Sequence, residues 1–71
     1  MPKTGSPEYA RFTRKLKAAR LAAGLTQAQA ARKLGKPQSF VSNCESGERR
    51  VDLIEANTFA KLYGCKVTDF L

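Results

Sequence analysis

The sequence predicts an all-α fold, a compact bundle of four to five short helices in one domain. Apolar residues recur at steps of three and four along the chain, which is the spacing of one helix face. Capping residues precede these stretches, and a glycine follows each of them at 24, 35, 47 and 64. The 71 residues suffice for one domain, in which a chain of this size buries only about 60% of its unfolded surface.

The first helix is expected to run to about Ala23, after a flexible N-terminal arm at residues 1–7, so that the domain spans residues 8–71. Ser6 is a suitable cap, and Pro7 suits the first helical position. The apolar stripe of this helix comprises Tyr9, Phe12, Leu16, Ala19 and Ala23. Helical rotation brings Arg20 to within roughly 20° of the stripe, so we expect it to be partly buried and to need a partner.

The second and third helices are predicted at residues 27–34 and 38–45. Thr26 caps the second helix, and Ala31 on its inner side would let another helix approach closely. Gly35 lies where the chain must turn sharply, which favours a positive φ. Pro37 prevents the second helix from simply continuing.

The third helix has two different sides. Val41, Cys44 and Glu45 share the inner one. The opposite side carries small polar residues, namely Ser39, Ser42, Asn43 and Ser46. Since Glu45 and Arg20 are charges on faces that should be buried, pairing them is the simplest way to satisfy both.

A fourth helix is predicted to begin after Asp52, because Asp52 and Glu55 have the spacing of a capping box. Its expected core stripe is Leu53, Ala56, Phe59, Ala60 and Tyr63. Gly64 terminates it. Thr68 is expected to cap a last short turn that carries Phe70 and Leu71.

The charge of the chain indicates a polyanionic partner. It has 13 basic and 6 acidic residues, a net charge of +7 and a pI near 9.9. Residues 1–50 carry a net charge of +8 and residues 51–71 one of −1, so one part of the molecule is expected to face an anion.

Other classes of protein are disfavoured. The chain has no histidine, no second carboxylate at a spacing from Glu45 that suits acid–base catalysis, and no metal-ligand cluster. We therefore expect no enzyme, no metal site, no cofactor and no small-molecule ligand. There is no apolar run long enough to span a membrane and no leader sequence, so a cytoplasmic protein with reduced cysteines is expected, and no membrane partner.

Four positions have the spacing of a helix-turn-helix: Ala31 where the helices cross, Gly35 in the turn, and Val41 and Cys44 holding the second helix down. With the G24-L25-T26-Q27 opening and the L34-G35-x-x-Q38-S39-x-V41-S42-x-x-E45-x-G47 run, the sequence resembles the Cro/C1-repressor (XRE-type) helix-turn-helix family. The resemblance covers roughly residues 12–71 and implies a lambda-repressor-like DNA-binding fold with its helix-turn-helix unit at 27–45.

The resemblance implies roles for particular residues. It makes Gln27 a contact to a DNA phosphate, and it pairs Arg20 with Glu45. It makes four positions of the third helix the base-reading ones: Gln38, Ser39, Ser42 and Asn43. Glutamine and asparagine can bond bidentately to adenine, and serine can donate or accept.

Three cations flank the third helix and are candidates for phosphate contacts: Lys36, Arg49 and Arg50. The family often has an apolar residue where this chain has Lys36 and a capping residue where it has Pro37. Cys44 is smaller than the usual Ile or Leu. Phe40 is larger than the usual residue, and it could press on a thymine methyl or only cover the edge of the core.

The expected function is that of a sequence-specific, DNA-binding transcriptional regulator, a repressor. The helix at residues 38–45 would lie in the major groove of a palindromic operator in double-stranded DNA. A homodimer through the C-terminal helices is expected, because one small copy offers few base contacts. The candidates for its surface, which could instead only close the core, are Ile54, Leu62, Val67, Phe70 and Leu71.

Two alternatives remain at this point. An antitoxin or a restriction-modification controller protein would share the fold and also bind DNA. A protein-interaction module would instead dock a partner with the same helices, which requires an apolar groove rather than the face of serine and asparagine found here, and its binding would survive high salt.

Overall fold

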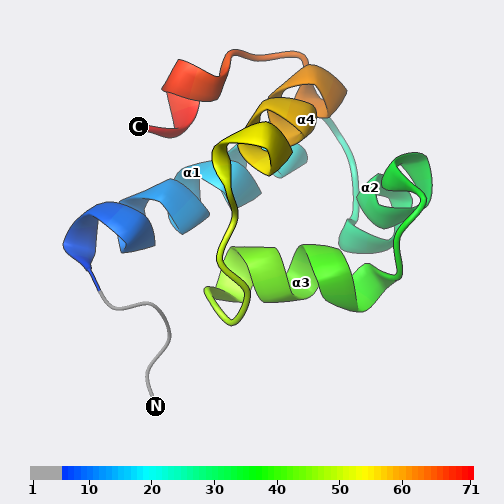
Figure 1. Cartoon of the computed structure of the whole chain (residues 1–71). Coiled ribbons are helices and arrows are strands. Elements are labelled where there is room, and N and C mark those ends of the chain that lie inside the picture. Colours follow the sequence, from blue (N-terminus) through cyan, green and yellow to red (C-terminus); the bar gives the residue numbers. More distant parts are fainter. Residues whose placement is uncertain (1–5) are drawn as a thin grey trace.

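The computed structural model describes residues 6–71, and within them the chain is helical with no strand. The elements, in chain order, are α1 (Pro7–Ala22), α2 (Gln27–Leu34), α3 (Gln38–Ser46), α4 (Leu53–Tyr63) and a 3-10 helix, η1 (Val67–Phe70). The predicted all-α bundle is therefore confirmed (Figure 1).

The helices begin where the capping residues predicted. The Ser6 side chain accepts a hydrogen bond from the backbone N–H of Tyr9 at 3.0 Å, and Pro7 is the first residue of α1. Ser6 and Pro7 thus form the start of α1 as expected, although the arm was drawn to residue 7, and residues 1–5 of that arm lie outside the described part. Thr26 and Asp52 each form a complete capping box at the starts of α2 and α4.

Three details of the predicted elements are wrong. Thr68 lies inside η1 instead of capping it, because the carboxylate of Asp69 accepts the backbone N–H of Lys66 at 3.1 Å and closes the turn from within. Leu53, expected in the core, is 73% exposed, because it is the first residue of α4 and stands at the rim of an open groove. Ala23 is exposed as well, because it follows the last residue of α1, where the chain turns away.

The core is small and combines aromatic with aliphatic side chains. Its largest fully buried side chains are Leu16, Val41, Cys44, Phe59 and Phe70. Ala30 and Ala31 are 0% and 2% exposed, and alanine at these positions lets α2 approach its neighbours closely. The ring of Phe59 stacks between those of Phe40 and Tyr63, with centroids at 6.1 and 5.8 Å.

The end of the chain closes this core from the side of α1. Phe70 is only 1% exposed and meets the ring of Phe12 edge-on, with the centroids 5.7 Å apart. Of the two roles expected for Phe70, a dimer surface or closure of the core, the structure shows closure of the core. Leu62 and Val67 are half-buried against the core, so only Ile54 and Leu71 of the expected dimer residues remain well exposed, at 75% and 73%.

α3 lies at one side of the molecule, and its two ends have different neighbours (Figure 1). α2 stands beside the N-terminal end of α3. The C-terminal end of α3 lies toward the start of α1, and from there the chain rises to α4. The polar side of α3 is therefore available to an external partner along its whole length.

The hydroxyl of Tyr63 is buried and has no hydrogen-bond partner within residues 6–71. Since a buried unsatisfied hydroxyl costs free energy, Tyr63→Phe should raise the free energy of unfolding by about 1 kcal/mol at pH 7. Burial also raises the pKa of the Tyr63 phenol. Below the unfolded pKa of about 10 the phenol is neutral in the folded and the unfolded chain, so its ionisation does not affect stability. At higher pH the phenol ionises more readily in the unfolded chain, which lowers the stability of the parent, so the advantage of the variant should grow in alkali.

Urea denaturation of the two proteins at neutral and alkaline pH checks this prediction. Tyr9 is unchanged in the two proteins, so a difference between them comes from Tyr63. A variant less stable than the parent at pH 7 would show that the hydroxyl makes a stabilising hydrogen bond.

Candidate nucleic-acid interface

The outer face of α3 carries the four predicted base-reading residues. Gln38, Ser39 and Asn43 are exposed, and Ser42 is half-buried. They face outward because Val41 and Cys44, both 0% exposed, hold the opposite side of α3 in the core. Helical steps of three and four then bring positions 39, 42 and 43 to one side.

Ser46 shares this outer face but has a local role. Its hydroxyl lies 3.3 Å from the carbonyl of Asn43, to which it donates, and it accepts the backbone N–H of Glu48 at 3.4 Å. The side chain therefore helps to end α3 beside Gly47, whose φ is 86°.

The turn between α2 and α3 depends on two backbone features. Gly35 has a φ of 70°, which side chains rarely allow, although no atom lies within 4 Å of the place where a Cβ would stand. Its conformation, and not lack of space, explains the glycine. Pro37 precedes α3 and supplies no side-chain cap. The N–H of Phe40 donates to the carbonyl of Pro37 at 3.0 Å. Those of Gln38 and Ser39 have no side-chain cap, and such groups at a helix start bind phosphate well.

Arg20 and Glu45 form the ion pair expected from helical geometry. Arg20 Nε lies 2.6 Å from Glu45 Oε2, and Arg20 Nη2 lies 3.1 Å from Glu45 Oε1. Arg20 Nη1 also donates to the carbonyl of Leu25 at 2.8 Å. The two side chains are only 6% and 4% exposed, and the hydrogen bond to Glu45 raises the pKa of Arg20. One guanidinium thus joins α1, the chain before α2, and α3.

The side chain of Gln27 belongs to the same network. Its Nε2 donates to Glu45 Oε1 at 3.1 Å, a contact that the sequence reasoning missed. The predicted phosphate contact of Gln27 can use its second amide hydrogen or its backbone N–H. The latter, with that of Ala28, stands at the start of α2, where Thr26 caps only the N–H of Gln29.

Two of the three flanking cations gather at one aromatic ring. Lys36 Nζ and the guanidinium carbon of Arg49 lie 5.4 and 4.8 Å from the ring centroid of Phe40. Phe40 itself stacks on Phe59, so it covers the edge of the core. Arg49 Nη1 also donates to Glu55 Oε1 at 2.7 Å, and this hydrogen bond raises the pKa of Arg49 and lowers that of Glu55.

The third cation lies apart from these two. The guanidinium of Arg50 stands 4.8 Å from the ring centroid of Tyr9 on α1, and the hydroxyl of Tyr9 accepts the backbone N–H of Val51 at 2.9 Å. The structure therefore places the three flanking cations at two separate aromatic rings beside α3. Neither aromatic contact was predicted from the sequence.

Cys44 has a packing role. It is 0% exposed, and burial raises the pKa of its thiol. Because a reactive cysteine needs exposure and a low pKa, Cys44 remains a neutral thiol that fills the space between α3 and the core. Within residues 6–71 there is no cluster of potential metal ligands.

Comparison with protein families agrees with this geometry. A family model described as helix-turn-helix matches residues 16–70, which is most of the chain. The chain belongs to the helix-turn-helix family. The Cro/C1-type membership that the motifs predicted is thereby confirmed, with α2 and α3 as the two helices of the motif. Among curated proteins, none matches the chain. None of the helices in residues 6–71 has the length and apolar character needed to cross a membrane.

Replacing Arg20 by methionine should lower the free energy of unfolding by roughly 3–5 kcal/mol, because Glu45 would stay buried without its partner. The double variant Arg20→Met, Glu45→Met should recover a large part of this loss, since it removes both charges. Urea denaturation of the parent, the two single variants and the double variant measures the coupling. If the loss in the double variant equals the sum of the losses in the two single variants, the two charges do not interact.

Proposed function

We propose that this chain is a sequence-specific transcriptional repressor that inserts α3 into the major groove of a palindromic operator. The observation that carries the proposal is the exposed polar face of α3 in a helix-turn-helix fold. Gln38, Ser39, Ser42 and Asn43 are short or medium side chains with both donors and acceptors, as reading of base edges requires. A helix of this diameter fits the major groove.

Phosphate contacts would fix the position of α3 on the duplex. The starts of α2 and α3 both offer backbone N–H groups, from Gln27 and from Gln38, and such groups hold phosphates in a defined register. Lys36 and Arg50 form no ion pair within residues 6–71, so their charges are available to DNA. The charge of Arg49 is partly offset by Glu55.

Repression would follow from occupancy of an operator. A palindromic operator implies two copies related by a two-fold axis, with half-site centres about one helical turn apart. One copy reads few base pairs, so a homodimer is the economical way to gain specificity. The rival function, a protein-interaction module, is disfavoured by the lack of exposed large apolar side chains on the outer face of α3.

In vitro selection of bound sequences from a random pool of double-stranded DNA tests the proposal. We expect one enriched motif with two-fold symmetry. Recovery of unrelated sequences would refute sequence-specific binding, and an enriched motif without symmetry would refute the palindromic operator.

Gln38→Ala should weaken binding to the selected site by roughly 1–3 kcal/mol, because one bidentate contact to a base is lost. Binding to a site changed at the corresponding base pair should be almost unaffected. Affinities of both proteins for both sites, measured at one salt concentration, separate the cases. An equal loss on all sequences would exclude Gln38 from base reading.

Arg50→Gln should reduce the slope of log affinity against log salt concentration by about one unit if Arg50 contacts a phosphate. The matched control is Arg14→Gln, which removes the same charge from the exposed face of α1 and should leave the slope unchanged. Titrations at several salt concentrations provide the slopes. The same slope for the parent and the Arg50 variant would remove Arg50 from the interface.

A further inference from the structure

The ion pairs Arg20–Glu45 and Arg49–Glu55 differ in their exposure to solvent. The first is enclosed in the protein, whereas the side chains of Arg49 and Glu55 are 42% and 25% exposed. An exposed ion pair contributes little to stability, so an external anion can replace one of its partners at small cost. The Arg49–Glu55 pair is therefore open to exchange, and the Arg20–Glu45 pair is not.

We propose that Glu55 is an intramolecular competitor of DNA: its carboxylate holds the guanidinium of Arg49 as a DNA phosphate would, and thereby lowers the affinity of the chain for duplexes of any sequence. The inference rests on the proposed function and deepens it, since Arg49 was predicted to contact a phosphate of the same interface. That contact forms only when Arg49 leaves Glu55.

The main chain of Arg49 is anchored beside the surface that would meet DNA. Its N–H donates to the carbonyl of Asn43 at 3.1 Å, and its carbonyl accepts the hydroxyl of Tyr9 at 3.5 Å. Asn43 is one of the predicted base-reading residues of α3, and Tyr9 belongs to α1. Because the main chain is held from both sides, only the side chain of Arg49 has to move when it exchanges Glu55 for a phosphate.

Glu55 is the anion of a site that two cations share. Lys36 and Arg49 both lie over the ring of Phe40, and Glu55 lines the same groove as Lys36 and Phe40. The hydrogen bond from Arg49 and the charge of Lys36 both lower the pKa of Glu55, so its carboxylate stays charged at neutral pH. The fork of an arginine fits carboxylate and phosphate oxygens alike. A phosphate can therefore take the place of Glu55.

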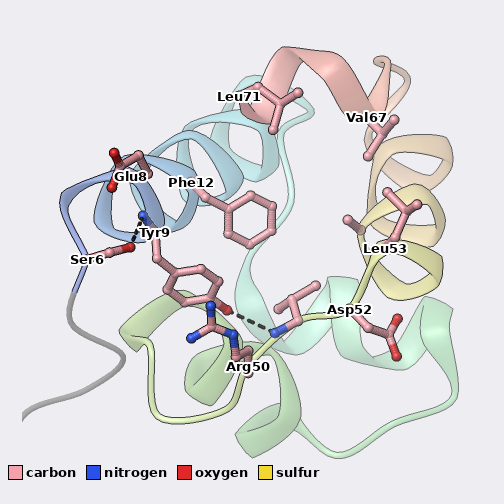
Figure 2. Close-up of a pocket in the computed structure, with 11 residues that line it drawn as sticks. Ser6, Glu8, Tyr9, Phe12, Arg50, Asp52, Leu53, Val67 and Leu71 are labelled. Atoms are coloured by element: carbon pink, nitrogen blue, oxygen red, sulfur yellow. Dashed lines mark hydrogen bonds between the residues drawn. The ribbon is translucent and has the colours of Figure 1, made fainter.

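The next residue, Arg50, provides a natural comparison. Figure 2 shows its side chain beside Tyr9, with the carboxylate of Asp52 pointing away from both. Its guanidinium lies 4.8 Å from the ring centroid of Tyr9, and it forms no ion pair within residues 6–71. Two adjacent arginines thus differ in one respect that matters for DNA, because Arg49 is already held by a carboxylate and Arg50 is not.

Glutamine at position 55 would remove the competing charge and keep the start of α4. Glu55 Oε1 accepts the backbone N–H of Asp52 at 3.2 Å, as the third residue of a capping box. In the equivalent box of α2, Gln29 Oε1 accepts the backbone N–H of Thr26 at 2.9 Å. An amide oxygen therefore serves this cap as well as a carboxylate does, and Glu55→Gln tests the charge alone.

Glu55→Gln should raise the affinity for DNA by roughly fivefold at 0.1 M salt, because Arg49 becomes free to bind a phosphate. The slope of log affinity against log salt concentration should become steeper by about one unit, since one more phosphate contact releases about one more counterion. A residue with only a structural role would not increase affinity when it is replaced. Circular dichroism verifies that each variant is folded.

A cycle of variants shows whether Glu55 acts through Arg49. In the Arg49→Gln background, Glu55→Gln should give no gain. In the Arg50→Gln background, which is the matched control, the gain should remain. The same gain in all backgrounds would mean that Glu55 acts only by long-range charge, and it would overturn the inference. An unchanged or lower affinity of Glu55→Gln in the parent background would overturn it as well.

Two duplexes of equal length, the selected site and an unrelated sequence, separate this inference from the proposed function. The gain should be the same on both, because phosphate contacts do not depend on sequence. If the parent prefers the selected site but the cycle fails, the inference about Glu55 alone is rejected. If the parent shows no preference, sequence-specific binding is rejected, and the cycle on the unrelated duplex still decides the role of Glu55. A parent that binds neither duplex rejects both.

Discussion

The buried ion pair between Arg20 and Glu45 is the constraint on which the rest of the structure depends. Moving two charges out of water is costly, and the cost is offset only when geometry and additional hydrogen bonds are good. Arg20 meets this condition with bonds to Glu45 and to the carbonyl of Leu25. Because Glu45 must point inward, the rotation of α3 about its axis is fixed, and Ser39 and Asn43 are turned outward as a consequence. A stability requirement thus sets which side chains an external partner can reach.

The fold could be predicted from the sequence where the information is local or periodic. Thr26 and Asp52 cap their helices through residues three positions away, and Arg20 returns to the buried stripe by rotation alone. The failures involve the ends of elements. Leu53 is in register with its stripe, but periodicity does not tell where the neighbouring helices stop. Phe70 belongs to the core only because η1 folds back on α1, a long-range contact that no local pattern contains.

The candidate site divides in the same way. The exposed face of Ser39, Ser42 and Asn43 could be predicted, because it lies opposite Val41 and Cys44 on one short helix, whereas Gln38 was named only through the family resemblance. The bond from Gln27 to Glu45 and the position of Arg50 over Tyr9 could not, since each joins residues from separate elements whose relative placement depends on packing. Charge alone identified Lys36 and Arg49, but only the structure shows that Phe40 brings them to one ring.

The small size of the chain limits both the apolar surface that it can bury and the number of base contacts that one copy could make. Seventy-one residues cannot cover all of their apolar side chains, and Leu53, Ile54 and Leu71 remain exposed around the first turn of α4 and the last turn of the chain. If α3 reads bases as proposed, one copy would read too few base pairs for a unique site in a genome. In the proposed function, a second copy would double the number of base contacts.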